Sequence, residues 1–276
     1  TWAKSSDDDL NDDLSYTLSL GANQSLLSGI EVSTEFSIDN FSLSFDGLDD
    51  YSQIAYSLND EANFTVSMWA KLNNIATNNI LVSQEGDWVW YIRNAGGSKQ
   101  LSFHVADNNF SMHVYDDLEI NTWYNFVLKY ENNKAFAYVN GVKITDIYEG
   151  QDLLFDKTAD FIDIGRWATD SEFISANMDD ISFFSSALTD QQIEMIFNNE
   201  FSFEQNQDLL IQFNFNEGSG LTLTDLSGNG NNGTISGASW SNDAPINNSN
   251  SISYTSETNL TDNTEYHWQV TAEDQS

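Results

Sequence analysis

The chain lacks cysteine altogether and carries a single proline, Pro245, among 276 residues. Without cysteine, neither disulfide bonds nor thiolate metal ligands can contribute, which leaves every compartment open, a bacterial exterior included. No run of roughly 18 apolar residues occurs either, so the sequence predicts no membrane-spanning helix and no membrane insertion. The chain starts at Thr1 without a methionine or a signal peptide, and we expect it to be a piece of a longer protein.

Basic residues are scarce: nine Lys and Arg stand against 43 Asp and Glu, which gives a formal net charge of −34. Such a surface repels phosphate backbones and anionic lipids, and this argues against nucleic acid as a partner. Two interpretations of the acids stay open. In the first, the acidic residues keep a secreted protein soluble in a salty habitat. In the second, several acidic residues converge on divalent cations.

Aromatic residues are abundant, with 18 Phe, 11 Tyr and 8 Trp, and they predict a chain that folds despite its charge. Apolar and polar residues alternate, as in 41–45 (FSLSF), 101–105 (LSFHV) and 124–128 (YNFVL). Asn140 and Gly141 lie between two apolar runs and predict a two-residue hairpin. The sequence therefore predicts an all-β fold, an antiparallel sandwich with one solvated face per sheet.

One helix is expected near residue 190. Thr189 and Gln192 have the spacing of a capping box, in which two side chains bond the first free backbone groups of a helix. Ile193, Ile196 and Phe197 then share one helical face.

Five segments in this order resemble a laminin-G-like (concanavalin A-like) jelly roll of bacterial surface proteins: 45–51 (FDGLDDY), 64–70 (FTVSMWA), 122–127 (TWYNFV), 137–141 (AYVNG) and 178–184 (MDDISFF). Residues 187–193 (ALTDQQI) are similar to the helix that follows the last strand in that family. Residues 209–240 resemble a strand pair of the same family, which often precedes the first segment but here follows the helix. The resemblance implies a binding or adhesion module.

The two ends of the chain are similar to parts of a fibronectin type III domain. Residues 1–32 resemble its front half, and 246–276 resemble its back half, with Leu260 and Tyr266 where that fold has its tyrosine corner. Because the front half comes first and the back half last, we expect a jelly roll over 33–245, inserted into one smaller fibronectin III-like β-sandwich. The alternative is that the ends are stumps of two different neighbouring domains.

The resemblance also implies a structural calcium ion. Related folds hold a calcium ion between an early strand and an aspartate of the last strand. In this chain the resemblance implies the side chain of Asp179 and the carbonyl of Gly47 as ligands, with Asp46 as a further ligand. Carboxylate and carbonyl oxygens suit Ca²⁺. The alternative is that Asp46 and Gly47 form a turn in which Asp49 and Asp50 are solvated.

A second acidic loop carries oxygen-bearing side chains at alternate positions: Asp225, Ser227, Asn229 and Asn231. The pattern matches part of a calcium loop but lacks the glutamate of the twelfth position. We favour the other interpretation, a glycine-rich turn held by its own side chains. The acidic cluster at 7–13 is expected to be a solvated loop or an interdomain calcium site.

Tryptophans beside arginines point to sugar binding, because aromatic faces stack on sugar rings while charged and amide groups bond the hydroxyls. Trp88 and Trp90 share one side of a predicted strand, and Arg166 precedes Trp167 in another segment. We expect Trp90 and Trp69 in the core. Trp88 and Trp167, with Arg166, are the predicted exposed ligand-binding platform.

Signals of an enzyme are poor. The resemblance implies that glycosidases of this fold carry three acids along one strand, and the nearest approach, Glu85 with Asp87, lacks the third. His104, His113 and His267 do not have a metal-ligand spacing. The sequence thus predicts a non-catalytic module.

The predicted function is calcium-supported binding of a glycan or a cell-surface protein, by a secreted or surface module on a bacterial exterior. Neighbouring domains of a longer chain are further expected partners. Two alternatives stay open: a structural spacer or assembly subunit of a cell-surface appendage, and a polysaccharide hydrolase or lyase.

Overall fold

The protein forms two compact units, Thr1–Asp39 with Ile246–Ser276, and Asn40–Pro245. The computed structural model describes residues 14–21, 31–32, 41–58, 61–75, 78–84, 87–105, 109–145, 147–149, 159–167, 172–245 and 267–274. Within them, regular structure is nearly all β-strand, which confirms the predicted all-β class. No helix in these ranges has the length and apolarity needed to cross a membrane.

Three strands make up the sheet of the first unit, in the order β2-β1-β22: β2 (Glu31–Val32), β1 (Leu14–Gly21) and β22 (His267–Asp274). β1 and β22 are antiparallel along their whole length, with Leu18 opposite Val270, so segments from both ends of the sequence share one sheet. Leu260 and Tyr266 lie outside the described residues, and the fibronectin III-like character of this unit stays a prediction.

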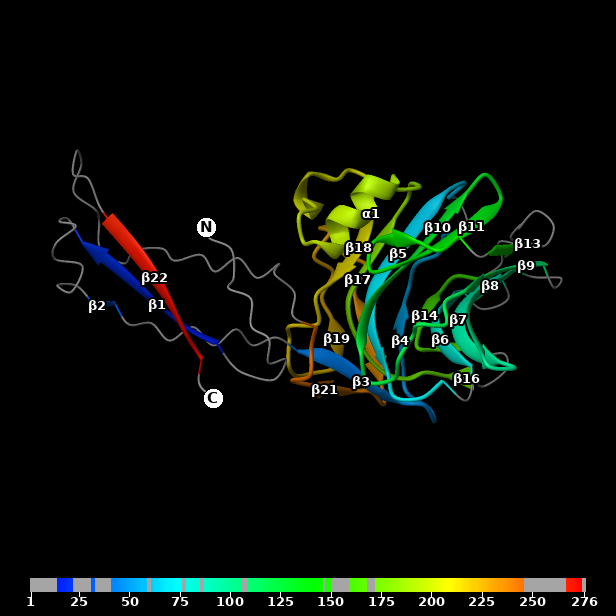
Figure 1. The fold of residues 1–276 in the computed structure, drawn as a ribbon, viewed down its shortest axis with the longest axis horizontal. Coiled ribbons are helices and arrows are strands. Elements are labelled where there is room, and N and C mark those ends of the chain that lie inside the picture. The colour runs from blue at the N-terminus through cyan, green and yellow to red at the C-terminus, as the bar shows by residue number, and fades with distance from the viewer. Residues whose placement is uncertain are drawn as a thin grey trace. The chain divides into compact units, whose positions relative to one another are not determined.

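The second unit is a sandwich of two antiparallel sheets, which lie side by side in Figure 1. The first sheet has the order β12-β11-β10-β5-β17-β3-β21, and β18 also pairs with β17. Its strands are β3 (Ser42–Asp46), β5 (Phe64–Leu72), β10 (Trp123–Glu131), β11 (Lys134–Val139), β12 (Val142–Lys143), β17 (Ser175–Phe184), β18 (Leu209–Phe213) and β21 (Ser239–Ser241).

The second sheet of the sandwich has nine strands in the order β13-β9-β8-β7-β6-β14-β4-β20-β19. They are β4 (Tyr51–Ile54), β6 (Asn79–Gln84), β7 (Trp88–Ala95), β8 (Ser98–Val105), β9 (Asn109–Val114), β13 (Ile147–Glu149), β14 (Ile162–Ile164), β19 (Thr222–Leu223) and β20 (Gly233–Ser236). A separate hairpin, β15 (Arg166–Trp167) with β16 (Glu172–Phe173), completes the described strands of this unit.

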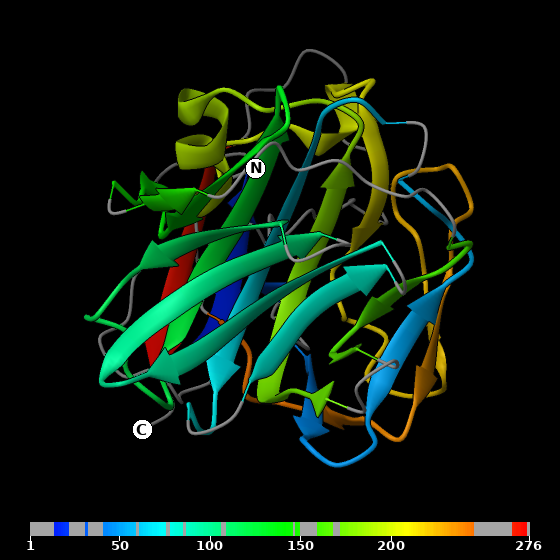
Figure 2. The same cartoon turned by 90° about the vertical axis from the view of Figure 1, so that its right-hand side faces the viewer.

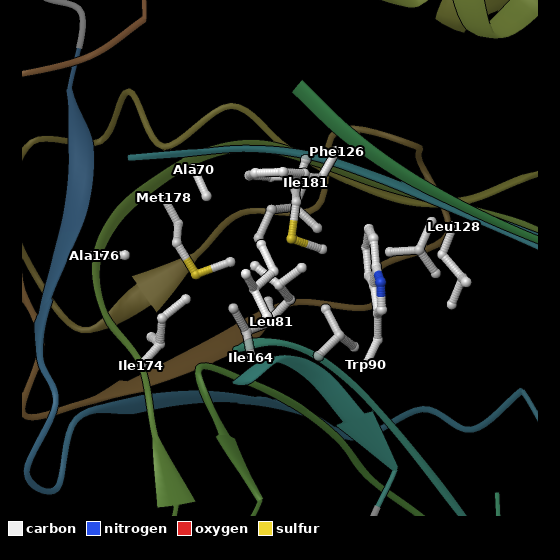
Figure 3. Packing of buried hydrophobic residues seen from close by; sticks show 14 of the residues in the cluster. Ala70, Leu81, Trp90, Phe126, Leu128, Ile164, Ile174, Ala176, Met178 and Ile181 are labelled. Atoms are coloured by element: carbon white, nitrogen blue, oxygen red, sulfur yellow. The ribbon is translucent and has the colours of Figure 1, made fainter. Parts of the chain in front are cut away.

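The core lies between the two sheets and follows from the alternation of the sequence. Every second residue of a strand points to the same side, so one apolar set per sheet is buried. Figure 3 shows side chains of the eight-stranded sheet, such as Phe126 and Met178, meeting Leu81, Trp90 and Ile164 of the nine-stranded sheet. Each large side chain buried in this way stabilises the fold by roughly 2 kcal/mol.

The helix α1 (Asp190–Phe197) covers part of the outer face of the eight-stranded sheet, and its predicted capping box is confirmed. Thr189 accepts a hydrogen bond from the backbone N–H of Gln192, whose side chain accepts one from Thr189 N–H in return. Trp69, expected in the core, instead lies half-buried on this outer face and stacks on Phe197, with ring centroids 5.8 Å apart. A short 3₁₀ helix, η3 (Phe203–Gln205), follows α1.

The predicted hairpin between β11 and β12 is also confirmed. Asn140 and Gly141 both have positive φ angles, of 50° and 75°, and Val139 pairs with Val142 across the turn. A left-handed conformation at both positions matches the twist of the paired strands, which is why asparagine and glycine occur there. Gly141 also lies under α1, where a Cβ atom would approach Phe197 Cβ to 3.1 Å.

Candidate functional site

The expected exposure of Trp88 is wrong. Its side chain is 3% exposed and lies in the core with Trp90, which is 1% exposed as predicted. The two residues are two positions apart on β7, so both point to the side of the sheet that faces the other layer. Trp88 stacks on Phe64 of the opposite sheet, with ring centroids 5.7 Å apart. It therefore offers no free ring face to a sugar.

The other side of β7 and β8 forms the outer face of the nine-stranded sheet, the face turned toward the viewer in Figure 2. Tyr91 and Arg93 of β7 and His104 of β8 share this side. The Tyr91 hydroxyl lies 3.0 Å from Nε2 of His104, and the two rings meet edge to face. Burial and the charge of Arg93 hold the pKa of His104 below its ordinary value, so the imidazole is mostly neutral at pH 7.

Trp167 packs against this outer face. It belongs to the β15–β16 hairpin, pairs with Glu172 and is half-buried. Asn78 Nδ2 donates to Glu172 Oε1 at 2.6 Å, which ties the hairpin to the start of β6. The residues beneath Trp167 are a small cluster on the outside of β6 and β7: Ile80, Val89 and Tyr91.

Arg166 does not present a free charge beside Trp167. Its Nε and Nη2 atoms donate to the two carboxylate oxygens of Asp163 at 3.0 and 3.3 Å. Its guanidinium carbon also lies 3.4 Å from the ring centroid of Tyr51. The carbonyl of Arg166 accepts a hydrogen bond from Ser83 Oγ at 2.7 Å. Arg166 thus fixes the position of the strand that carries Trp167.

A buried acidic cluster lies in the other sheet, at a bulge in β17. Asp179 is 1% exposed, and its Oδ1 atom accepts the backbone N–H of Asp180 at 2.7 Å. Its Oδ2 atom is buried and has no hydrogen-bond partner among the described residues. Asp180 has a positive φ of 46°, which bends the strand here. Burial raises the pKa of Asp180 to about 7.

Glu217, in the segment after β18, lies near enough for its charge to act on Asp179. Its Oε1 atom accepts the backbone N–H of Thr224 at 2.7 Å, while Oε2 is buried without a partner in the described part of the chain. Burial, with the neighbouring charges of Asp180 and Glu217, holds the pKa of Asp179 well above its usual range.

Two oxygens of this cluster suit a hard divalent cation, but among the described residues only Asp46, Asp49 and Asp50 have three carboxylate oxygens all within 4.8 Å of one another. Two buried oxygens, one on Asp179 and one on Glu217, lack donors among the described residues, and leaving a buried polar group unpaired costs roughly 1–3 kcal/mol. An ion such as Ca²⁺ binds oxygen ligands of this kind and would offset the repulsion between the carboxylates.

The structure does not bring Asp46 together with Asp179. The pairing of β3 with β17 places Asp46 opposite Ser175, and Asp179 lies four residues further along β17, about 13 Å away. The oxygens that bind one Ca²⁺ lie within about 5 Å of one another. Gly47 is next to Asp46, and a Cβ atom added to it would approach Ser175 Cβ to 2.9 Å.

Asp46, Asp49 and Asp50 instead form their own group, with carboxylate oxygens within 4.8 Å of one another. Hydrogen bonds hold this group as a turn: Asp50 Oδ2 accepts the N–H of Asp46, and Asp46 Oδ1 accepts the N–H of Leu48. Asp46 and Asp49 are exposed, in keeping with the alternative of an acidic turn, whereas Asp50 is buried beneath it.

The interpretation of the second loop as a self-held turn is confirmed. Asp225 Oδ1 accepts the backbone N–H groups of Gln212 and Ser227, and Oδ2 accepts that of Asn231 and the Ser227 hydroxyl. All four bonds are 2.8–3.0 Å long, so the described donors surround the carboxylate. Despite burial, these bonds hold the pKa of Asp225 below its usual value.

A family model described as the concanavalin A-like lectin/glucanases superfamily matches residues 45–194, more than half of the chain. The protein belongs to this superfamily. The predicted concanavalin A-like jelly roll is thereby confirmed, and the sandwich of Asn40–Pro245 is its concanavalin A-like domain.

A solved structure with a TM-score above 0.5 shares the fold of this concanavalin A-like domain. A Bacteroides ovatus protein provisionally assigned to carbohydrate binding is 21% identical, with a TM-score of 0.58 over 73% of this chain and 59% of its own. A heptameric pentraxin of Limulus polyphemus is 16% identical, with a TM-score of 0.48 over 59% of this chain and 83% of its own. The chain thus spans less than two thirds of the first of these proteins. Comparison with curated proteins gives no match.

Two features of these sites were not predicted from the sequence: the charge of Glu217 near Asp179, and Arg93 on the outer face. Glu217 lies in the segment 210–220 that resembles the superfamily's strand pair, but nothing local shows which acid it approaches. For Trp88 a signal was present: it shares a side with Trp90, which was predicted to be buried.

Proposed function

We propose that the protein is a non-catalytic glycan-binding module of a secreted or cell-surface protein, and that it binds through the outer face of β6–β9 and the β15–β16 hairpin. The observation that carries this proposal is the packing of Trp167 against the cluster of Ile80, Val89 and Tyr91, on a face that also carries Arg93 and His104. An aromatic ring beside hydrogen-bonding side chains suits a sugar, which has apolar ring faces and polar edges.

The polar groups of this face have the chemistry that sugar hydroxyls require. His104 is half-buried and neutral, and Gln100 lies opposite Arg93 on the neighbouring strand. Tyr91 is buried, and its hydroxyl bonds His104 and so holds the imidazole in place. The provisional assignment of the Bacteroides ovatus protein to carbohydrate binding is in keeping with this proposal.

A calcium ion is part of the proposal, with Asp179 and Glu217 as ligands and Asp180 beside them. Bound there, the ion would link β17 to the segment after β18 and relieve the repulsion between buried carboxylates. Its role would be structural, because β17 belongs to the other sheet of the sandwich from β6–β9.

A second candidate function is a structural spacer or assembly subunit of a surface appendage. The pairing of β1 with β22 favours it, because both ends of the described chain then belong to one sheet. A fibronectin III-like unit built in this way would connect the concanavalin A-like domain to neighbouring domains of a longer protein.

A polysaccharide hydrolase or lyase has less support. Glycosidases need two carboxyl groups about 5–9.5 Å apart beside the substrate. β6–β9 contain no Asp or Glu, and Asp163 is bound by Arg166.

The test is a glycan array with neutral and acidic oligosaccharides in millimolar calcium, followed by calorimetric titration of any hit. Trp167→Ala should weaken binding by about tenfold or more, since stacking and burial of the ring are lost. Trp123→Ala is the matched control, because Trp123 is also half-buried but lies on the other sheet. Equal binding by both variants, with unchanged melting, would sink the proposed site, and an array without hits would favour the spacer.

A further inference from the structure

The outer face of β6–β9 differs in charge from the rest of this acidic protein. None of these four strands contains Asp or Glu. Outward positions on other strands do carry acids: Asp163 on β14, Asp46 on β3 and Asp179 on β17. Glu172 of the adjoining β15–β16 hairpin is an acid within the proposed binding face, and its carboxylate accepts a hydrogen bond from Asn78. Acids are disfavoured in strands generally, but these examples show that this sandwich tolerates them at outward positions.

Arg93 lies on the outer side of these four strands. Its Nε atom donates to Gln100 Oε1 at 3.2 Å, and its guanidinium carbon lies 5.8 Å from the centroid of the Tyr91 ring. No carboxylate of the described residues lies within 4.0 Å of it, although acids outnumber basic residues in the chain by 43 to nine. Gln100 therefore fixes the guanidinium while leaving its charge uncompensated by any described carboxylate.

Arg166 provides the comparison within the same sandwich. Its guanidinium is bound by Asp163, whereas Arg93 is held by a neutral amide. Because Nε is the atom bonded to Gln100, the two terminal amino groups of Arg93 remain as a fork. A fork of this kind matches two oxygens of one carboxylate or sulfate group.

We propose that Arg93 binds an acidic group of the glycan, a uronate carboxylate or a sulfate ester, on the outer face of β7 and β8. This inference rests on the proposed function and assigns the ligand class of the same face. Trp167 packs against the cluster that contains Tyr91, and Arg93 lies beside the Tyr91 ring, so we infer that one acidic oligosaccharide can contact both Trp167 and the guanidinium.

The net charge of −34 does not prevent such binding. At physiological salt, charges are screened beyond about 8 Å, so the groups near Arg93 decide the local potential. Acidic surfaces elsewhere repel a polyanion, and this favours the outer side of β6–β9, whose strands carry no acids. Repulsion from the whole protein predicts that binding strengthens as salt rises from very low values to about 0.1 M.

The experiment compares three matched probes by calorimetric titration: oligogalacturonates, the same oligomers with their carboxyl groups reduced, and sulfated galactan oligosaccharides. Arg93→Gln should weaken binding of the acidic probe by about tenfold or more, as the loss of a charge-assisted hydrogen bond predicts, and leave binding of the reduced oligomers unchanged. The acidic series that shows this dependence identifies carboxylate or sulfate as the group.

Lys99→Gln is the matched control. It removes the same charge one position from Gln100, on the opposite side of β8, and should leave all three affinities unchanged. Arg93→Lys keeps the charge without the fork and should retain part of the affinity. Melting curves establish that each variant is folded.

The outcomes separate the two proposals. Reduced oligomers that bind as tightly as acidic ones, with loss in Trp167→Ala but not in Arg93→Gln, overturn this inference and leave glycan binding standing. If no probe binds and the glycan array also shows no hit, the proposed function fails and the inference fails with it.

Discussion

The hydroxyl of Tyr91 and Nε2 of His104 lie 3.0 Å apart across the adjacent strands β7 and β8. This contact holds the imidazole on the outer face, which also carries the guanidinium of Arg93. Burial and that positive charge both disfavour the protonated ring and lower the pKa of His104, which has consequences for pH dependence.

The pKa of His104 is expected to lie below 6.5 in the folded protein. Arg93→Gln should raise it, because a positive charge is removed, but should leave it below 6.5, because burial is the larger cause. An NMR titration of the assigned imidazole measures this, with Lys99→Gln as the control. An unchanged pKa in Arg93→Gln would show that the guanidinium lies too far away to matter.

The lowered pKa of His104 also makes the stability of the folded protein depend on pH. Between the folded pKa and 6.5, the unfolded chain binds more protons at His104 than the folded one. The stability that His104 contributes is therefore present above pH 6.5 and is lost as pH falls through the folded pKa. Urea unfolding of His104→Gln and of the native chain, from pH 8 to 5, measures this. The free energy of unfolding should fall less with pH in the variant than in the native chain.

Calcium is expected to raise the melting temperature. At about a hundredfold above its Kd, the ion would raise Tm by roughly 5–10 °C for a unit of this size, and a chelator should reverse the rise. Asp179→Asn should abolish the shift. In chelator, however, this variant should melt at or above the native protein, because it removes a buried charge.

Asp46→Asn is the control for the calcium prediction, since Asp46 is exposed and distant from Asp179 along the sheet. It should keep the full calcium shift. A native chain that melts identically in calcium and chelator would remove the ion from the proposed function, and the unpaired oxygens of Asp179 and Glu217 would need another explanation.

Gly141→Ala should destabilise the sandwich by about 1–3 kcal/mol or more. The position has a φ of 75°, and a Cβ would lie 3.1 Å from Phe197 Cβ and 3.3 Å from Glu194 Cα. Gly96→Ala is the matched control, because Gly96 has a φ of 64° but its added Cβ would meet no described atom within 4 Å. Denaturant unfolding of both variants separates backbone strain from displacement of α1. Equal losses of unfolding free energy would show that the contact of the added Cβ with α1 has no effect.

Asp225→Asn should cost about 2–4 kcal/mol of unfolding free energy, because the amide nitrogen of asparagine would face the N–H donors that now bind the carboxylate. Asp208→Asn changes an exposed carboxylate on the neighbouring turn and should change stability by less than about 0.5 kcal/mol. Denaturant unfolding measures both. Comparable losses in the two variants would mean that the Asp225 network contributes little.

Several elements were predictable because their determinants are local. Thr189 and Gln192 are three residues apart, Asn140 and Gly141 are adjacent, and the partners of Asp225 include Ser227 and Asn231 on the same loop. In each case, side chains close in sequence satisfy or bend the backbone between them. The order of the family segments similarly predicted the concanavalin A-like jelly roll.

The exposure of the tryptophans was less predictable. Alternation shows that Trp88 and Trp90 share a side, but not that this side meets Phe64 of the opposite sheet. The prediction for Trp69 was wrong in the opposite sense, since it was expected in the core. Its side of β5 points outward and is covered in part by Phe197 of α1. Which side of a strand is buried depends on the layers packed against it.

The sequence by itself determined the all-β class, the strand alternation, the hairpin at Asn140 and the cap at Thr189, because neighbouring residues set these through backbone geometry and hydrogen bonds. Only the tertiary structure decided that the charge of Glu217 acts on Asp179, that Asp179 lies far from Asp46 along the sheet, and that Arg93 lies on the outer side of strands that carry no acids. The physical reason is strand register: it brings together residues distant in sequence, and a shift along one strand changes every partner.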